Sequence, residues 1–183
     1  NAEKIILCLS GFISAIGTVM LPKVSRMTRM KQMDAVQRHI RLSMELVMCM
    51  VCAMAFGLAA VAVNFAPLFY GDDFAYSGTL MMPLAFTLLS IGFANVIRTQ
   101  WVLPQGRDTI FVHSVLTGAV INLIANFVLI PPLGAMGAAA ATVLAEFSVP
   151  AVQFVYLRKE LPYAHYLKTT GVYCLFGLVM AGV

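Results

Sequence analysis

The carboxyl group of Glu146 lies in the middle of a long apolar run of the sequence. Counted from Gly134, about 12 residues at 1.5 Å each put Glu146 roughly 18 Å along a helix, near the midplane of a bilayer. A carboxyl group at that depth faces the protein interior or water, which makes it a candidate functional group suited to proton exchange. Thr142 and Gln153 fall on the same helical face and extend it into a polar stripe. Pairing of the carboxylate with a cation on another helix is the structural alternative.

Two asparagines follow one face of the preceding apolar run. Ser114, Gly118, Asn122 and Asn126 succeed one another at four-residue steps, so on a helix they form a single ridge. Amide groups inside lipid need hydrogen-bond partners, which come from neighbouring helices or from a transported substrate. Asn122 and Asn126 are therefore predicted either to join helices or to line a cavity.

Arg98 is a basic residue at the end of the third apolar run, where it shares a helical face with Asn95. Its planar guanidinium group is suited to binding phosphate. A side chain that reaches for the membrane surface is the alternative interpretation. We therefore include Arg98 among the candidate substrate contacts.

The sequence contains no recognisable pattern of a catalytic or metal-binding site. Cys49 and Cys52 have the C-x-x-C spacing, but no second pair and no nearby histidine completes a tetrahedral metal site. Asp72 and Asp73 are adjacent and follow a glycine, which is typical of an exposed turn. We therefore expect a protein that is not an enzyme and that uses no cofactor or metal.

Long apolar helices must position these groups. Hydrophobic residues make up 61% of the chain and charged residues 11%, a composition far from that of a soluble domain. The period-two alternation of a membrane barrel is absent, so the predicted fold class is all-α, a polytopic transmembrane helix bundle formed as a single domain by residues 1–183. The expected helices cover about 5–21, 46–69, 80–97, 110–130, 134–157 and, incomplete at the end of the sequence, 169–183.

Basic residues concentrate in alternate connections between the runs. Eleven of the twelve Lys and Arg residues lie in three of them, and Lys4 is the exception. By the positive-inside rule, these three connections are cytoplasmic, and the loops at 70–74 and 131–134 face the other side. The formal charge of +4 is thus explained by membrane topology, and no nucleic-acid partner is expected.

The connection 22–45 carries six of these cations and is also amphipathic. Apolar residues recur in it at spacings of three and four, from Val24 to Ile40. This pattern predicts a basic cytoplasmic segment that lies as an interfacial helix against anionic headgroups.

Four stretches of the chain carry a family resemblance, and the last of them ends at Glu146 after an asparagine pair, a proline turn and a Gly/Ala run. They cover residues 14–27, 66–78, 100–111 and 118–146. In these stretches the chain resembles the polysaccharide transporter, or oligosaccharide flippase (Wzx-like), branch of the multidrug/oligosaccharidyl-lipid/polysaccharide flippase superfamily.

The resemblance implies two six-helix lobes around a central cavity, of which this chain is most of the C-terminal lobe. It implies a multi-pass protein of the bacterial inner membrane that flips undecaprenyl-pyrophosphate-linked oligosaccharide repeat units for O-antigen, capsule or exopolysaccharide biosynthesis. Alternating access would be coupled to an ion gradient. Glu146 would then be the coupling or ion-pairing group, Asn122 and Asn126 would line the cavity, and Arg98 would contact phosphate.

The expected partners are the lipid bilayer, the lipid-linked oligosaccharide and the missing N-terminal lobe of the same chain. That lobe is expected because the sequence begins at Asn1 and stops within an apolar run. A cation-coupled multidrug antiporter and a peptidoglycan-precursor flippase of the same superfamily remain as alternatives. A noncatalytic membrane scaffold, or part of a membrane polymerase, is the alternative from a different class.

Overall fold

Helices account for all the regular secondary structure in the described part of the chain. The computed structural model describes the backbone of residues 2–70 and 75–181 and the side chains of residues 4–62 and 77–181. The elements are α1 (Ala2–Arg29), α2 (Met33–Tyr70), α3 (Ala75–Ala85), α4 (Thr87–Ile97), the π-helical η2 (Arg98–Val102), the 3-10 helical η3 (Leu103–Gln105), α5 (Asp108–Leu133), α6 (Ala135–Leu157) and α7 (Tyr163–Ala181).

Five segments of these described residues are long and apolar enough to cross a membrane. One of them, Ser77–Gln105, combines most of α3 with α4, η2 and η3, while α1, α2, α5 and α6 supply the others. The predicted all-α, polytopic bundle is confirmed. The last apolar run is also helical, but α7 begins at Tyr163, before the expected start at residue 169.

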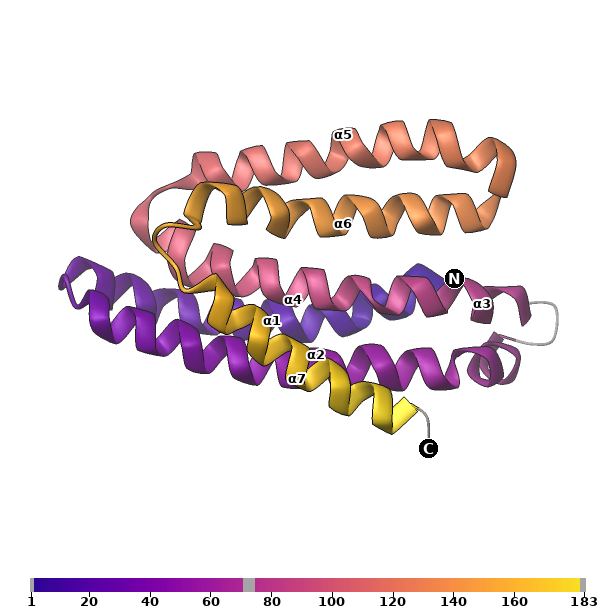
Figure 1. Ribbon diagram of the computed structural model, residues 1–183, viewed down its shortest axis with the longest axis horizontal. Helices are drawn as coiled ribbons and strands as arrows, with labels where there is room; N and C mark the ends of the chain where they lie inside the picture. Colours follow the sequence, from indigo (N-terminus) through magenta and orange to yellow (C-terminus); the bar gives the residue numbers. More distant parts are fainter. Residues whose placement is uncertain (1, 71–74, 182–183) are drawn as a thin grey trace.

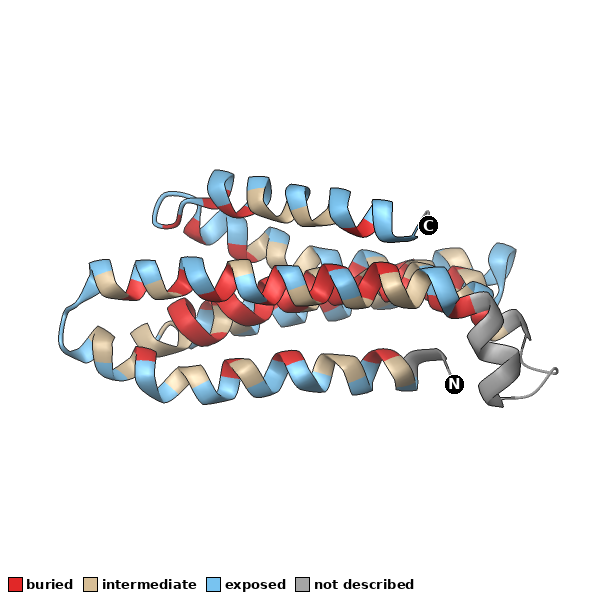
Figure 2. Ribbon diagram, turned by 90° about the horizontal axis from the view of Figure 1, so that it is seen from below, coloured by how far each residue is buried: buried red, intermediate tan, exposed pale blue. Residues whose placement is uncertain are grey.

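The helices form two unequal groups on either side of α4 (Figure 1). The hairpin of α5 and α6 packs as one layer, and α6 contacts α4. On the other side, α4 contacts α1 and α2, and α7 lies against α2. In the 18-residue apolar window of the span that contains α4, 67% of the residues are buried, against 11% in the window of α5, so α4 is the central element and α5 has an open face. Figure 2 shows the same contrast, because the buried residues concentrate on the central helices.

The three basic connections lie at one end of the bundle, on the left in Figure 1. They are the turn between α1 and α2, the segment from η2 to the start of α5, and the link between α6 and α7. The tight turn between α5 and α6 lies at the opposite end. The loop around Asp72 and Asp73 lies outside the described residues. We refer to the left end of Figure 1 as the basic end.

The structure of residues 22–45 differs from the expected interfacial segment. Helix α1 continues to Arg29 and α2 begins at Met33, so the basic stretch consists of the ends of two long helices. The turn between them is closed by the amide of Gln32, which donates to the carbonyl of Met27 at 3.1 Å. Val36 and Ile40 of the apolar stripe are fully buried between packed helices, whereas Met30 and Met33 at the turn are exposed.

A glycine sets the close approach of α5 and α6 near their turn. A Cβ atom at Gly137 would collide with the backbone carbonyl of Leu129, which cannot move without distorting α5. Small residues at helix contacts allow this kind of close packing in membranes. The hairpin that forms one layer of the bundle therefore depends on the missing side chain at residue 137.

We expect Gly137→Ala to destabilise the protein by about 1 to 3 kcal/mol, because the added methyl group overpacks the hairpin. Gly171→Ala is the matched control, since a Cβ at that helical position meets nothing within 4 Å. It should leave stability unchanged or raise it by up to about 1 kcal/mol through helix propensity. Thermal unfolding of the full-length protein in detergent measures both. Equal effects of the two substitutions would contradict the assigned packing.

Candidate functional site

A cleft of about 680 Å³ lies between α4 and the α5–α6 hairpin. All four residues singled out from the sequence line it, namely Arg98 on η2, Asn122 and Asn126 on α5, and Glu146 on α6. Ser14 contributes to the lining from α1. Residues from four separate parts of the chain are thus brought to one cavity inside the membrane-spanning part of the molecule.

The α6 wall presents a polar stripe to this cleft. Thr142, Glu146 and Gln153 all line it, as their spacing predicts. The backbone carbonyl of Glu146 accepts a hydrogen bond from the hydroxyl of Ser90 on α4, so α6 is fixed against α4 at this residue. Gln153 is 1% exposed, and its Oε1 atom has no partner among the described residues. An amide oxygen left without a partner costs free energy, which favours a ligand or water at this position.

The two asparagines on the α5 wall hydrogen-bond to each other. Nδ2 of Asn126 donates to Oδ1 of Asn122 at 2.9 Å, and both side chains are half-buried. Gly118 also lines the cleft, and a Cβ there would lie 3.1 Å from a methyl group of Val149 on α6. Ser114 differs from the predicted ridge, because it is buried outside the cleft lining and donates to the carbonyl of Phe111 at 2.8 Å.

The wall formed by α4 and η2 carries the positive charge of the cleft, on Arg98. The guanidinium carbon of Arg98 lies 5.1 Å from the centroid of the Phe111 ring, a cation–π contact that joins η2 to α5. Within the described chain Arg98 has no ion pair with a carboxylate. Asn95 lies one turn away, 6% exposed, and its Oδ1 atom has no hydrogen-bond donor there. Phe111 was missed from the sequence, because nothing local indicates that an aromatic ring of α5 meets Arg98.

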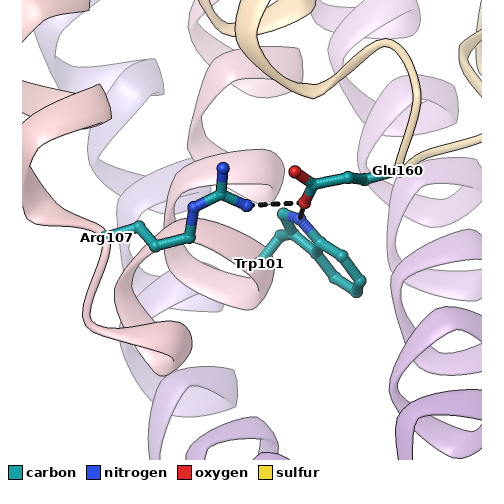
Figure 3. A network of polar contacts seen from close by, with 3 residues as sticks. All are labelled: Trp101, Arg107 and Glu160. Carbon is teal, nitrogen blue, oxygen red and sulfur yellow. Dashed lines mark hydrogen bonds and ion pairs between the residues drawn. The ribbon is translucent and has the colours of Figure 1, made fainter.

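A network of three side chains borders the site at the basic end (Figure 3). Oε2 of Glu160 accepts a hydrogen bond from Nε1 of Trp101 at 3.1 Å and another from Nη1 of Arg107 at 2.5 Å. The Arg107 hydrogen bond, with a smaller contribution from Trp101, holds the pKa of Glu160 below its ordinary value of 4.5, against the opposing effect of burial. No sequence pattern indicated this network, since its members come from segments far apart along the chain.

The sequence pattern of a known family matches almost the whole chain. That family is described as the lipid II flippase MurJ, and residues 1–182 are matched. No solved structure shows a significant match to the chain.

Two curated relatives have low sequence identity to this chain. One, named as an O-antigen transporter of Shigella dysenteriae, is 22% identical over 136 residues, which are 74% of this chain and 33% of the relative. The other, named as a low-salt glycan biosynthesis flippase of Haloferax volcanii, is 24% identical over 173 residues, 94% of this chain and 36% of the relative. The chain therefore spans about a third of the length of these relatives.

The hydrogen bonds of Glu160 predict a pH-dependent stability. Its pKa is lowered in the folded state, so its carboxylate stabilises the fold above pH 4.5 and this contribution is lost as the pH falls through the lowered pKa. We expect Glu160→Gln to reduce stability at neutral pH by about 0.2 to 1 kcal/mol, as for other exposed pairs, and the difference from wild type to shrink as the pH falls below 4.5 and through the lowered pKa. Thermal unfolding of the full-length protein across this range measures it.

The exposed neighbour Lys159 provides the control, because Lys159→Gln changes one charge in the same connection. The effect of Lys159→Gln on stability should not disappear at acidic pH in the way predicted for Glu160→Gln. A difference in stability between wild type and Glu160→Gln that stays constant from neutral pH until the protein unfolds in acid would contradict the ionised hydrogen bond.

Proposed function

The chain belongs to the lipid II flippase MurJ family, and on that basis we propose that the full-length protein flips a lipid-linked oligosaccharide, carried on undecaprenyl pyrophosphate, across the bacterial inner membrane. The observation that supports this best is the cleft between α4 and the α5–α6 hairpin. It places a carboxyl group, a guanidinium group and several amides within helices that are apolar enough to span a membrane. Both curated relatives are also named for moving or assembling glycans.

The groups of the cleft match the parts of such a substrate. The guanidinium of Arg98, near the basic end, suits the pyrophosphate through its planar fork of donors. The amides of Asn122 and Asn126 line the cleft further along, where they offer donors and acceptors to sugar hydroxyls. Glu146 is proposed to couple flipping to an ion gradient, or to pair with a cation during alternating access.

The orientation and the partners follow from the same proposal. The basic end faces the cytoplasm, and the open face of α5 receives the N-terminal lobe of the same chain. Residues 1–183 then form one unit of a multi-pass protein, the C-terminal lobe, and the product of flipping enters O-antigen, capsule or exopolysaccharide biosynthesis.

The family match favours one second candidate function, the flipping of the peptidoglycan precursor lipid II. Lipid II is also a sugar carried on a polyprenyl pyrophosphate, so the role proposed for Arg98 is the same. The two candidates differ in the headgroup that the amide-lined part of the cleft must accommodate.

Complementation of bacterial strains tests the proposed function. We expect the full-length protein to restore surface polysaccharide in a strain that lacks its oligosaccharide flippase, and Glu146→Gln at matched protein level to restore less than about a tenth, because an amide cannot exchange a proton or pair with a cation. Asp34→Asn is the control, an acid-to-amide change at an exposed residue of α2. Rescue only of a strain that lacks its lipid II flippase would favour the second candidate, and rescue of neither would contradict both.

Binding measurements test the phosphate contact. We expect Arg98→Gln to weaken binding of undecaprenyl pyrophosphate by the full-length protein about tenfold, and Arg98→Lys to fall between, because lysine keeps the charge without the planar fork or the stacking on Phe111. Arg38→Gln, at an exposed arginine of α2 at the same end, is the control. Equal affinities of wild type and Arg98→Gln would exclude Arg98 from the site.

A further inference from the structure

Glu160 joins the two ends of the α5–α6 hairpin. Arg107 is the residue that precedes α5, and Glu160 lies just beyond the end of α6 at Leu157. The 2.5 Å contact between Nη1 of Arg107 and Oε2 of Glu160 therefore closes the hairpin at its base. The tight turn at Gly134 closes it at the opposite end. The layer that forms two walls of the cleft is thus held at both ends.

The same carboxylate oxygen also attaches the hairpin to the extension of α4. Trp101 belongs to η2, is 4% exposed, and donates its indole N–H to Oε2 of Glu160 at 3.1 Å. Figure 3 shows Trp101 from η2 and Arg107 from the connection before α5 pointing toward this one oxygen. Gly106, with φ of 67°, turns the chain back so that the amide of Arg107 donates to the carbonyl of Val102 at 3.1 Å. This turn brings Arg107 to the side of Trp101.

Arg98 begins the π-helical segment in which Trp101 lies. Five residues form that segment, so the directions of the two side chains are fixed by one short stretch of backbone. Such π-helical turns are rare and are often found at functional sites. The guanidinium of Arg98 rests on Phe111, one turn along α5 from Arg107. Glu160 consequently connects η2, which carries Arg98, to the α5–α6 hairpin, which carries Phe111.

We propose that Glu160 is a positioning residue for the substrate site. By accepting both hydrogen bonds it holds η2 and the α5–α6 hairpin at the separation that seats Arg98 over Phe111, and so sets the affinity of the cleft for the pyrophosphate of the substrate. This inference rests on the proposed function, because it acts through Arg98.

An exposed ion pair alone would have little effect on the site. The side chains of Arg107 and Glu160 are 34% and 36% exposed, but the indole that shares the acceptor is buried. Hydrogen bonds to an ionised acceptor are stronger than neutral ones. The buried donor, rather than the exposed one, carries the restraint from Glu160 to the backbone turn that holds Arg98.

Two measurements on the full-length protein test the proposal. The first is binding of undecaprenyl pyrophosphate in lipid nanodiscs, where Glu160→Ala should weaken affinity about tenfold, within the range of coupling inside one hydrogen-bonded network. Glu160→Gln should retain most of the affinity, because its amide oxygen can still accept from Trp101. Trp101→Phe removes only the buried hydrogen-bond donor and should reproduce most of the loss of affinity expected for Glu160→Ala. Lys159→Gln, in the same connection, should bind like wild type.

A double-mutant cycle separates positioning from a merely structural role. If Glu160 acts through Arg98, adding Glu160→Ala to the Arg98→Gln variant should weaken binding by less than about a further twofold. A second tenfold loss in the Arg98→Gln background would overturn the proposal, because the two residues would then act independently.

The second measurement does not depend on the substrate. Spin labels at Gln37 on α2 and Thr109 on α5, both exposed near the basic end, report the distance between the two layers by electron resonance. Glu160→Ala should lengthen or broaden that distance, and an unchanged distribution would overturn the proposal. If the wild-type protein fails to bind undecaprenyl pyrophosphate, the proposed function fails. The comparison of the spin-label distances in wild type and Glu160→Ala still shows whether Glu160 holds the layers together.

Discussion

Hydrocarbon supplies no hydrogen-bond partners, and this constraint shapes every part of the molecule. Helices satisfy the backbone internally, and small hydroxyl side chains such as Thr142 donate back to a carbonyl of their own helix. Ser90 goes further and donates to the backbone carbonyl of Glu146, which joins α4 to α6. Several other polar groups, including Arg98 and Gln153, line one cleft instead of facing lipid. The cleft is therefore a polar cavity within helices that are apolar enough to span a membrane.

The α5–α6 hairpin forms one packed unit of the layered arrangement. The α5–α6 hairpin is packed tightly within itself through Gly137, and α6 packs against α3 and α4. A hairpin that packs as one unit is suited to the rigid-body movements of transporters, in which one bundle rocks against another. Membership of the lipid II flippase MurJ family agrees with such a movement of the hairpin.

The helical periodicity of the sequence was sufficient to predict the fold class and several polar residues that line the cleft. Asn122, Asn126 and Glu146 were found because four-residue steps on one helix place side chains on one face, and a polar face within an apolar run must meet protein. The bond from Trp101 to Glu160 could not be predicted, because it depends on a π-helical turn and on contacts between distant segments. The basic stretch 22–45 was interpreted as an interfacial helix because an apolar stripe looks the same whether it packs on lipid or on another helix.

The most direct test of the account is a leaflet assay with the purified full-length protein in liposomes. The vesicles contain an undecaprenyl-pyrophosphate-linked oligosaccharide with a fluorescent label, and a membrane-impermeant reductant destroys only the label exposed on the outside. The account predicts that the protected pool on the inside becomes accessible in vesicles with protein, at a rate that rises with the amount of protein. A protected pool as stable as in protein-free vesicles, with or without an ion gradient, would contradict a flippase function.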